Sequence, residues 1–265
     1  MGSRWTAAAA CAGVLALSLL MGGCATGPTI DTRYSASAQA SRIDLLVIHY
    51  TALDFPTSLR VLTQQSVSSH YLVDEDPPTI YRLVEEGRRA MHAGASAWSG
   101  RQMVNTSSIG IEIVNRGYVV TPEGPRFHPY PEPQIQAVIA LVRDIVKRHG
   151  IPPHRVVGHS DVAPGRKSDP GPLFPWKRLA DEGLALWFDE TRAAALRPGY
   201  EQELPPLPWF QQRLAKLGYL VPLHGEADRA TGDVMRAFQM RFRPSRHDGQ
   251  PDAETAAILA ALTSP

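Results

Sequence analysis

Cysteine is nearly absent from this chain of 265 residues, which contains only Cys11 and Cys24. Both lie close to the N-terminus, so the rest of the chain has neither a disulfide nor a thiolate nucleophile. Two catalytic signatures are also missing, the Gly-x-Ser-x-Gly of many serine hydrolases and the His-Glu-x-x-His of helical zinc proteases. If the chain is an enzyme, it must use a metal, a serine or carboxylates.

The chain also lacks an excess of charge of either sign. The formal net charge is +1, from 27 basic and 26 acidic side chains. Nucleic-acid binding usually shows as a concentrated basic patch, so we expect no nucleic-acid partner. The hydrophobic fraction of 43% is ordinary for a globular protein. The length suits one large domain and one small one.

The N-terminus lacks an apolar run long enough for a comfortable membrane span. The stretch from Ala7 to Leu20 is shorter than the roughly 20 residues that cross a bilayer. It follows Arg4 and ends in small residues, a pattern typical of a secretory signal. Cys24 comes directly after two glycines. This segment resembles the bacterial lipoprotein signal, in which that cysteine is lipidated and becomes the first mature residue.

We therefore expect a signal peptide over residues 1–23, lipidation of Cys24 and a flexible tether over residues 24–41. Met21 is unusual three residues before such a cysteine, so a plain secretory signal stays open as the alternative. Ala25 follows the cysteine, rather than aspartate, which fits transfer to the outer membrane. The resemblance thus implies a protein attached by an N-terminal lipid anchor to the periplasmic face of the outer membrane.

Hydrophobic patterning predicts an α/β domain over residues 42–190, in which strands are covered by helices. Ile43–Ile48 is almost wholly apolar, as in a strand buried on both faces, and Ser108–Val114 alternates isoleucine with other residues. Apolar residues recur every three or four positions in Glu132–His149, which predicts a helix. Shorter predicted elements are a helix at 57–65 and strands at 70–73, 79–84 and 155–158.

A linker is predicted over residues 191–206, in a region rich in proline and glutamate. A small helical domain is predicted over residues 207–265. It contains the pattern Gly-x-x-Asp-x-x-Thr at 225–231 and again at 249–255, each time before a helical pattern. Because aspartate favours the N-cap position, we interpret this repeat as structural.

The segment Gly158–Pro172 contains the densest set of candidate site residues. It carries His159, Asp161, Lys167 and Asp169, with too much glycine and proline for a helix or a strand. Binding and catalytic residues are often found on such loops. His159 and Asp169 can bind zinc through nitrogen and oxygen, and Asp161 is a competing oxygen ligand that the spacing does not exclude.

A third metal ligand must come from elsewhere in the chain. His49 ends the first apolar strand. With His159 and Asp169 it makes a three-ligand set, as in catalytic zinc sites that leave one position for water. Either histidine alone would be read as a hydrogen-bonded core or surface residue. Their placement at a strand end and at the start of a rigid loop strengthens the case for a metal, and both interpretations stay open on spacing alone.

Glu112 and Lys167 are the candidate catalytic groups. Glu112 lies on a strand otherwise built of apolar residues, where a carboxylate is costly unless it faces a polar site. It could act as the base that an activated water requires, and an edge-strand charge facing solvent is the alternative. Lys167 could stabilise an oxyanion, although its spacing alone favours the alternative of an exposed loop cation.

Five short motifs follow one another within residues 42–185. They are Ile48-His49-Tyr50-Thr51, Ser69-His70-Tyr71, His92-Ala93-Gly94, Ser108-Ile109-Gly110-Ile111-Glu112, and Gly158-His159-Ser160-Asp161 with Lys167-Ser168-Asp169-Pro170-Gly171. In this order, and with ten residues from His159 to Asp169, they resemble the type 2 N-acetylmuramoyl-L-alanine amidases. That family shares its fold with animal peptidoglycan recognition proteins.

The resemblance implies a mixed central sheet flanked by helices and a site that contains zinc. The implied ligands of Zn²⁺ are His49, His159 and Asp169, with Glu112 as the catalytic base. Lys167 would stabilise the transition state, and Asp161 would shape the loop. The implied reaction is hydrolysis of the amide between N-acetylmuramic acid and the L-alanine of the stem peptide, in peptidoglycan or muropeptides.

A catalytically silent peptidoglycan receptor is the alternative from another functional class, because the same fold also serves for binding. Receptors without activity typically lose a metal ligand. All three implied ligands are present in this chain, as are Glu112 and Lys167. The site therefore favours the enzyme.

Five more residues fall in segments that surround the family's substrate groove, and we assign them to substrate binding: His70, His92, Trp98, Asn105 and Asn115. Trp98 could stack on a sugar face or belong to the core. Met91 stands where many relatives carry tryptophan, which affects the expected shape of the glycan subsite.

The C-terminal domain resembles the three-helix peptidoglycan-binding domain found beside many wall hydrolases. The resemblance rests on Leu214-x-x-Leu217-Gly218-Tyr219, on the doubled Gly-x-x-Asp-x-x-Thr and on Phe238-Gln239. A catalytic domain joined to a wall-binding one gains effective concentration on a polymeric substrate.

Overall fold

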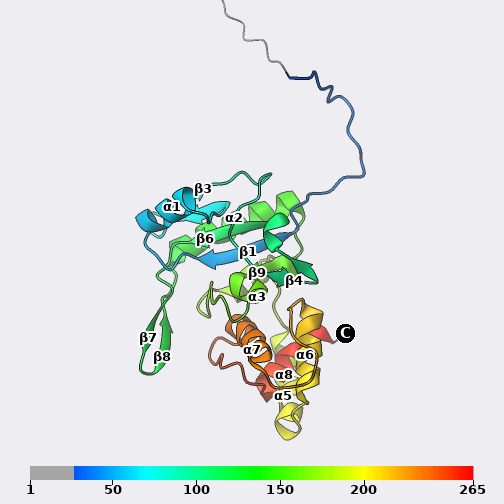
Figure 1. The fold of residues 1–265 in the computed structure, drawn as a ribbon. Coiled ribbons are helices and arrows are strands. Elements are labelled where there is room, and N and C mark those ends of the chain that lie inside the picture. The colour runs from blue at the N-terminus through cyan, green and yellow to red at the C-terminus, as the bar shows by residue number, and fades with distance from the viewer. Residues whose placement is uncertain (1–26, 265) are drawn as a thin grey trace, which may run out of the picture. The chain divides into compact units, whose positions relative to one another are not determined.

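A five-stranded sheet organises the part of the chain that carries the candidate site (Figure 1). The computed structural model describes residues 27–264. The strand order is β3-β2-β6-β1-β9, and all pairs are parallel except β2 with β3. This is the mixed sheet that the sequence predicts. Its strands are β1 (Leu45–Tyr50), β2 (Tyr71–Val73), β3 (Ile80–Arg82), β6 (Ser108–Ile113) and β9 (Val156–Gly158).

Shorter elements surround the sheet, and several of them were not predicted. The helices are α1 (Phe55–Gln64), α2 (Glu132–His149), α3 (His159–Val162) and α4 (Trp176–Asp181), with 3-10 turns at Val104–Thr106 and Pro153–Arg155. Two hairpins pair β4 (Ala97–Trp98) with β5 (Arg101–Gln102) and β7 (Tyr118–Thr121) with β8 (Gly124–Phe127). Alternation in the sequence did not reveal these four strands, which are two to four residues long.

Helix α2 covers one face of the sheet and has the bounds that the sequence predicts. Its apolar stripe packs against Leu46 and Ile48 of β1 and against the isoleucines of β6. It ends at Gly150, which adopts φ +66°, a backbone conformation that favours glycine. Because side chains alternate along a strand, His49 and Glu112 lie on the opposite face.

Four helices form the C-terminal helical domain: α5 (Glu190–Gln202), α6 (Leu207–Leu217), α7 (Arg229–Phe242) and α8 (Ala253–Thr263). The linker predicted over residues 191–206 was wrong for most of its length, because α5 occupies it and packs against α8. Only Ala193 of α5 is fully buried. The apolar stripe is therefore too thin to stand out in a sequence rich in proline and glutamate.

The doubled Gly-x-x-Asp-x-x-Thr is structural, as predicted. Asp228 caps α7 by accepting a hydrogen bond from the Thr231 amide at 2.7 Å, and Asp252 caps α8 through the Thr255 amide at 2.8 Å. In each copy the glycine amide donates to a buried glutamine of the preceding helix, and that glutamine donates to the threonine hydroxyl. The repeat therefore builds the same turn-to-helix unit twice.

The second face of the sheet shares one apolar core with the helical domain. Val47 and Val157 of the sheet belong to the same buried cluster as Phe210 and Phe238. Residues 40–265 accordingly form one compact unit. Residues 27–39 belong to a separate unit and contain no helix or strand. No helix within residues 27–264 is both long and apolar enough to cross a membrane.

Candidate metal centre and active site

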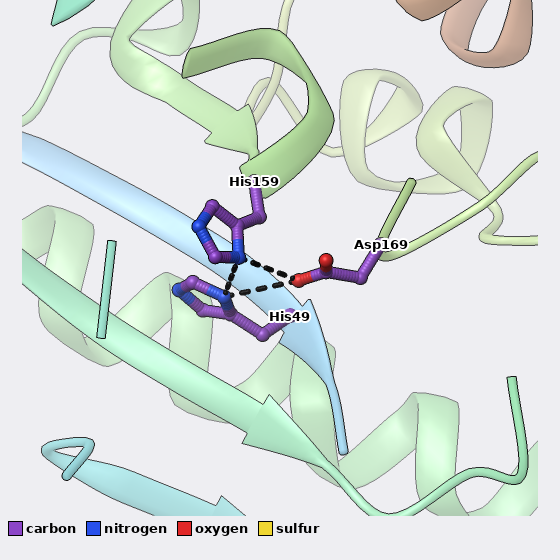
Figure 2. Close-up of side chains that lie close together, drawn as sticks. All are labelled: His49, His159 and Asp169. Carbon is purple, nitrogen blue, oxygen red and sulfur yellow. Dashed lines mark hydrogen bonds and ion pairs between the residues drawn. The ribbon is translucent and has the colours of Figure 1, made fainter. Parts of the chain in front are cut away.

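Three side chains that are distant in sequence meet on the second face of the sheet (Figure 2). Nδ1 of His49 lies 2.8 Å from Nδ1 of His159 and 3.1 Å from Oδ2 of Asp169. Nδ1 of His159 lies 3.0 Å from the same oxygen. All three residues are buried, and among the described residues they form the only such group suited to a metal ion.

Neighbouring strands bring the two histidines together. His49 lies near the end of β1, and His159 follows β9, which pairs with β1. The expectation that the 158–172 segment contains no helix was wrong at its start, because His159 is the first residue of α3. The Ser160 amide donates to the Asp169 carbonyl at 2.8 Å, which folds the rest of the segment back onto the cluster.

The far ring nitrogens of both histidines are hydrogen-bonded. Nε2 of His159 lies 3.1 Å from the Ala93 carbonyl, and Nε2 of His49 lies 3.0 Å from Nδ1 of His92. Since a carbonyl can only accept, the ring of His159 carries its proton on Nε2. That leaves the Nδ1 lone pair for a metal, which is the usual arrangement of histidine ligands.

The charge states of the cluster also suit a metal. Burial and the neighbouring His159 lower the pKa of His49 to about 4, so its ring is neutral at pH 7. Burial alone would raise the pKa of Asp169, but the two imidazoles lower it below its usual range. Two imidazoles and a carboxylate are a common donor set for zinc.

The spacing of the donors fits a tetrahedral ion. Bonds of about 2.0–2.1 Å to zinc would hold ligand atoms roughly 3.3 Å apart. The observed separations of 2.8–3.1 Å are close to that value. The three donor atoms therefore fit a zinc ion, the metal that the motif resemblance implies.

Glu112 lies beside the cluster, on an interior strand. It is the register partner of His49, and its Oε1 lies 3.9 Å from Nδ1 of that residue. Because β6 lies between β2 and β1, the alternative of an edge-strand charge in solvent is wrong. Its Oε2 is buried without a hydrogen-bond partner among the described residues. Burial, and then the charge of Asp169, raise the pKa of Glu112 well above its usual value.

A cavity of about 220 Å³ opens onto the cluster and Glu112. Lys167 lines this cavity from the exposed side of its loop, and its side chain forms no ion pair within residues 27–264. Met91, which is 40% exposed, lines it as well. The other lining residues are Tyr50, Thr51, Leu53, Ser58, Val61, Leu62, Val67, Ser68, His92, His159 and Asp169.

Four of the five residues assigned to substrate binding do not line this cavity. His70 is fully buried and binds the Gly110 amide and the Arg88 carbonyl. Trp98 packs edge-on against Tyr219 in the core. Asn105 accepts from the Ala93 amide, and Asn115 binds the backbone at Gly117 and Pro129. The side-chain polar atoms of His70, Asn105 and Asn115 are thus used by the fold, and Nε1 of Trp98 is buried without a hydrogen-bond partner among the described residues. The structure does not support the assignment.

His92, the fifth residue, does line the cavity, but its ring is used by the protein. Besides His49, it contacts the Ser108 hydroxyl at 3.0 Å through Nε2. A Cβ on Gly110 would lie 2.5 Å from the His92 ring. This close approach explains a glycine within a strand of isoleucines, and that glycine was the sequence signal for a buried ring.

Asp161 is not part of the metal-binding group. Its Oδ2 accepts from the Gly158 amide at 2.8 Å and from the Arg241 guanidinium at 2.9 Å. The carboxylate of Asp161 is directed toward Gly158 and Arg241, so the alternative that Asp161 is a metal ligand is excluded. Its contact with Gly158 is the loop-shaping role that the resemblance implies. Arg241 was not identified from the sequence.

Comparisons with known proteins agree with this geometry. The family model for N-acetylmuramoyl-L-alanine amidase matches residues 39–172, and a model for a peptidoglycan binding domain matches residues 205–259. The chain is 44% identical to the N-acetylmuramoyl-L-alanine amidase AmiD of Escherichia coli (strain K12), over 94% of this chain and 95% of AmiD. The chain belongs to the N-acetylmuramoyl-L-alanine amidase family. The resemblance seen in the motifs is confirmed.

Two solved structures share the whole architecture. AmpDh3 of Pseudomonas aeruginosa, in complex with anhydromuramic pentapeptide, matches with a TM-score of 0.82 at 40% identity, over 88% of this chain and 97% of AmpDh3. AmiD of E. coli, in complex with the substrate anhydro-N-acetylmuramic acid-L-Ala-D-gamma-Glu-L-Lys, matches with a TM-score of 0.80 at 45% identity, over 89% and 94%. These matches confirm the predicted fold class.

Proposed function

We propose that this protein is a zinc amidase that hydrolyses the bond between N-acetylmuramic acid and the L-alanine of the stem peptide. One observation carries the proposal: His159 and Asp169 of the cluster with His49 line the same cavity as Glu112, whose carboxylate has an unpartnered oxygen. Membership of the amidase family supports the reaction class.

Glu112 is the general base in this proposal. What zinc would supply at the cluster is a water acidic enough to react near neutral pH. Glu112 takes a proton from the attacking water and delivers it to the leaving amine nitrogen of L-alanine. A carboxyl group whose pKa is raised by burial suits both transfers.

Lys167 stabilises the negative charge that develops on the carbonyl oxygen of the scissile amide. Its ammonium group is not neutralised by an ion pair with any residue in 27–264, and it lies on the rim of the cavity. Removal of one donor from an oxyanion hole costs about 2.7–4 kcal/mol in other enzymes. Asp169 is close by in the same loop and binds the metal.

Soluble muropeptides with a 1,6-anhydro end are the first substrates to test. The solved complexes of AmiD and AmpDh3 contain anhydromuramyl peptides, and this chain matches both proteins over most of its length. Binding of intact peptidoglycan by the helical domain would add effective concentration on the sacculus. A role in wall remodelling or recycling follows from either substrate.

We further propose that the protein is anchored in the outer membrane through a lipid on Cys24, facing the periplasm. Cys24 and the signal peptide over residues 1–23 lie outside the described residues, so this proposal rests on the sequence. Replacement of Cys24 by serine should move the protein from the membrane fraction to the soluble fraction. Persistent membrane attachment of that variant would contradict the anchor.

The decisive experiment incubates the protein lacking residues 1–24 with purified sacculi and with soluble anhydromuropeptides. Mass spectrometry should show free stem peptides that begin with L-alanine. Product formation should stop when a chelator removes the metal and return when zinc is added. Binding of sacculi without any cleavage would instead identify a peptidoglycan receptor.

A further inference from the structure

A buried ion pair joins the metal-binding turn to the helical domain. Asp161 of α3 is 1% exposed, and Arg241 of α7 is 5% exposed. Nη1 of Arg241 donates to Oδ2 of Asp161 at 2.9 Å. The Tyr219 hydroxyl donates to Oδ1 at 2.6 Å. Both donors come from the C-terminal part of the chain, so the carboxylate is held from outside the catalytic domain.

The same carboxylate shapes the turn that carries a metal ligand. Oδ2 of Asp161 also accepts from the Gly158 amide at 2.8 Å, across the turn that contains His159. The amide of Ser160, the residue after His159, donates to the carbonyl of Asp169 at 2.8 Å. Two of the three metal-binding residues therefore depend on a turn whose central carboxylate is fixed by the helical domain.

Arg241 is itself held in place on several sides. Its guanidinium lies 4.1 Å from the centre of the Trp176 ring, and Nη2 donates to the Leu186 carbonyl at 3.3 Å. The ring of Tyr219 packs edge-on against Trp98 at 4.9 Å. Neither donor can follow Asp161 if the turn shifts, because each is packed against the core.

Stability alone does not account for such a pair. A buried ion pair often contributes no more to stability than apolar side chains of the same volume. The charges do, however, fix the orientation of the two side chains, since a displaced carboxylate would be left buried without a hydrogen-bond donor. A rigid support of this kind matters at a metal site, where outer-sphere contacts commonly change metal affinity or activity 10- to 100-fold.

We propose that Tyr219 and Arg241 are positioning residues of the catalytic centre, acting through Asp161 on the turn of His159 and the loop of Asp169. We call Asp161, Tyr219 and Arg241 the interdomain clamp. The helical domain then has a second task besides binding the wall, because it completes the support of the metal site. This inference rests on the proposed amidase function for its kinetic readout, but not for its metal-retention and amide-exchange readouts.

The test uses the full-length chain with Tyr219→Phe, which removes one hydroxyl and keeps the ring. The matched control is Tyr200→Phe, because the Tyr200 ring packs against Trp209 and its hydroxyl makes no hydrogen bond within residues 27–264. We expect Tyr219→Phe to lower kcat on a soluble muropeptide about 3- to 10-fold, as for one lost hydrogen bond. KM should change less than twofold, since no substrate contact is lost.

Two further measurements report directly on the turn that contains His159. Zinc should leave the Tyr219→Phe protein several times faster in the presence of a chelator. In the metal-free protein, hydrogen exchange of amides 158–163 should be faster than in the parent. Arg241→Lys should retain more kcat and more zinc than Arg241→Gln, because lysine keeps the charge beside Asp161. Tyr200→Phe should match the parent in all readouts.

The inference is overturned if Tyr219→Phe lowers the melting temperature while kcat, zinc loss and amide exchange stay at parental values. It is also overturned if Arg241→Lys and Arg241→Gln lose kcat equally and only in proportion to their lost stability. If the parent shows no amidase activity, the proposed function fails. Zinc loss and amide exchange would still decide the clamp.

Discussion

At the scale of single residues, Glu112 carries a largely buried carboxylate that lies beside the candidate metal centre. Its carboxylate lies 3.9 Å from Nδ1 of His49, and one oxygen has no partner among the described residues. An unpartnered buried carboxylate destabilises a fold. Its presence is therefore accounted for by the proposed role as catalytic base, since stability does not explain it.

We expect Glu112→Ala to lower kcat by about 10²–10⁴-fold while zinc content stays at the parental level, because a base is lost and no ligand is removed. Turnover is measured on soluble muropeptides and zinc by elemental analysis. Glu203→Ala is the matched control, since Glu203 is exposed and follows α5. Parental turnover in Glu112→Ala would remove this residue from the mechanism.

His92 supports the metal site through His49. With Nδ1 of His49 facing the cluster, its Nε2 donates to His92, and His92 donates in turn to the Ser108 hydroxyl. We expect His92→Ala to weaken zinc binding about 10- to 100-fold, measured by competition with a chelator. His154→Ala, at an exposed turn, is the control. Equal zinc affinity in both variants would show that the chain of hydrogen bonds is dispensable.

The sequence identifies the residues of the site better than their surroundings. The motif resemblance implies that His49, His159 and Asp169 form one cluster, whereas residue type and spacing alone left Asp161 open as a ligand. Contacts of His70, Trp98 and the two asparagines could not be predicted, because amides, indoles and imidazoles serve the core as readily as a substrate. Only the fold shows which of these polar atoms are already used.

At the scale of elements, periodicity predicts what is long and amphipathic. Helix α2 has the bounds that its apolar stripe indicates, and the capping aspartates of α7 and α8 lie where the repeat places them. Helix α5 was mistaken for a linker, since its buried side is narrow and Pro198 lies within it. Tertiary packing against α8 stabilises this helix, although its amino-acid composition does not favour one.

The two copies of the repeat offer a comparison of caps in one protein. We expect Asp228→Ala to lower the free energy of unfolding by about 0.5–2 kcal/mol, through loss of the N-cap bond. Asp252→Ala should cost more, because Asp252 also pairs at 2.8 Å with Arg243, whose side chain is 3% exposed. Denaturant unfolding measures both, with Asp228→Asn as the cap-preserving control. Equal losses would mean that the Arg243 pair adds nothing.

Glu86 joins the end of α2 to the sheet. Burial would raise its pKa, but hydrogen bonds from Arg148, Tyr71 and His149 lower it to about 2. The pKa of Glu86 is thus lower in the folded state than the ordinary value near 4.5, so its stabilisation is complete above that pH and is lost as the pH falls toward 2.

Replacement of Glu86 by glutamine should therefore lower stability at pH 7 by about 1.5–3 kcal/mol, as for hydrogen bonds to a charged group. The difference from the parent should shrink as the pH falls from 5 to 2. Melting temperatures across this range measure it. A difference that is constant with pH would contradict the assigned cause.

At the scale of the whole molecule, the two family domains are built into one body. The sheet contributes Val47 and Val157 to the cluster that contains Phe210 and Phe238 of the helical domain. The interdomain clamp lies within the same boundary. Sequence patterns predict two domains, but they do not show which apolar faces meet, because that depends on how the two domains pack.

A chain that ends after residue 189 should therefore fold poorly, although it contains every proposed ligand and both proposed catalytic residues. It would expose the apolar face around Val47 and Val162, at a cost of roughly 1.5–3 kcal/mol for each large side chain, and would leave Asp161 without Arg241. Soluble yield and melting temperature should both fall. The matched control lacks residues 1–39, the other unit of the chain, and should have the same melting temperature as the full chain. A fragment 40–189 with parental melting temperature and kcat would show that the catalytic domain needs no partner, and that the shared core is a contact between two independent domains.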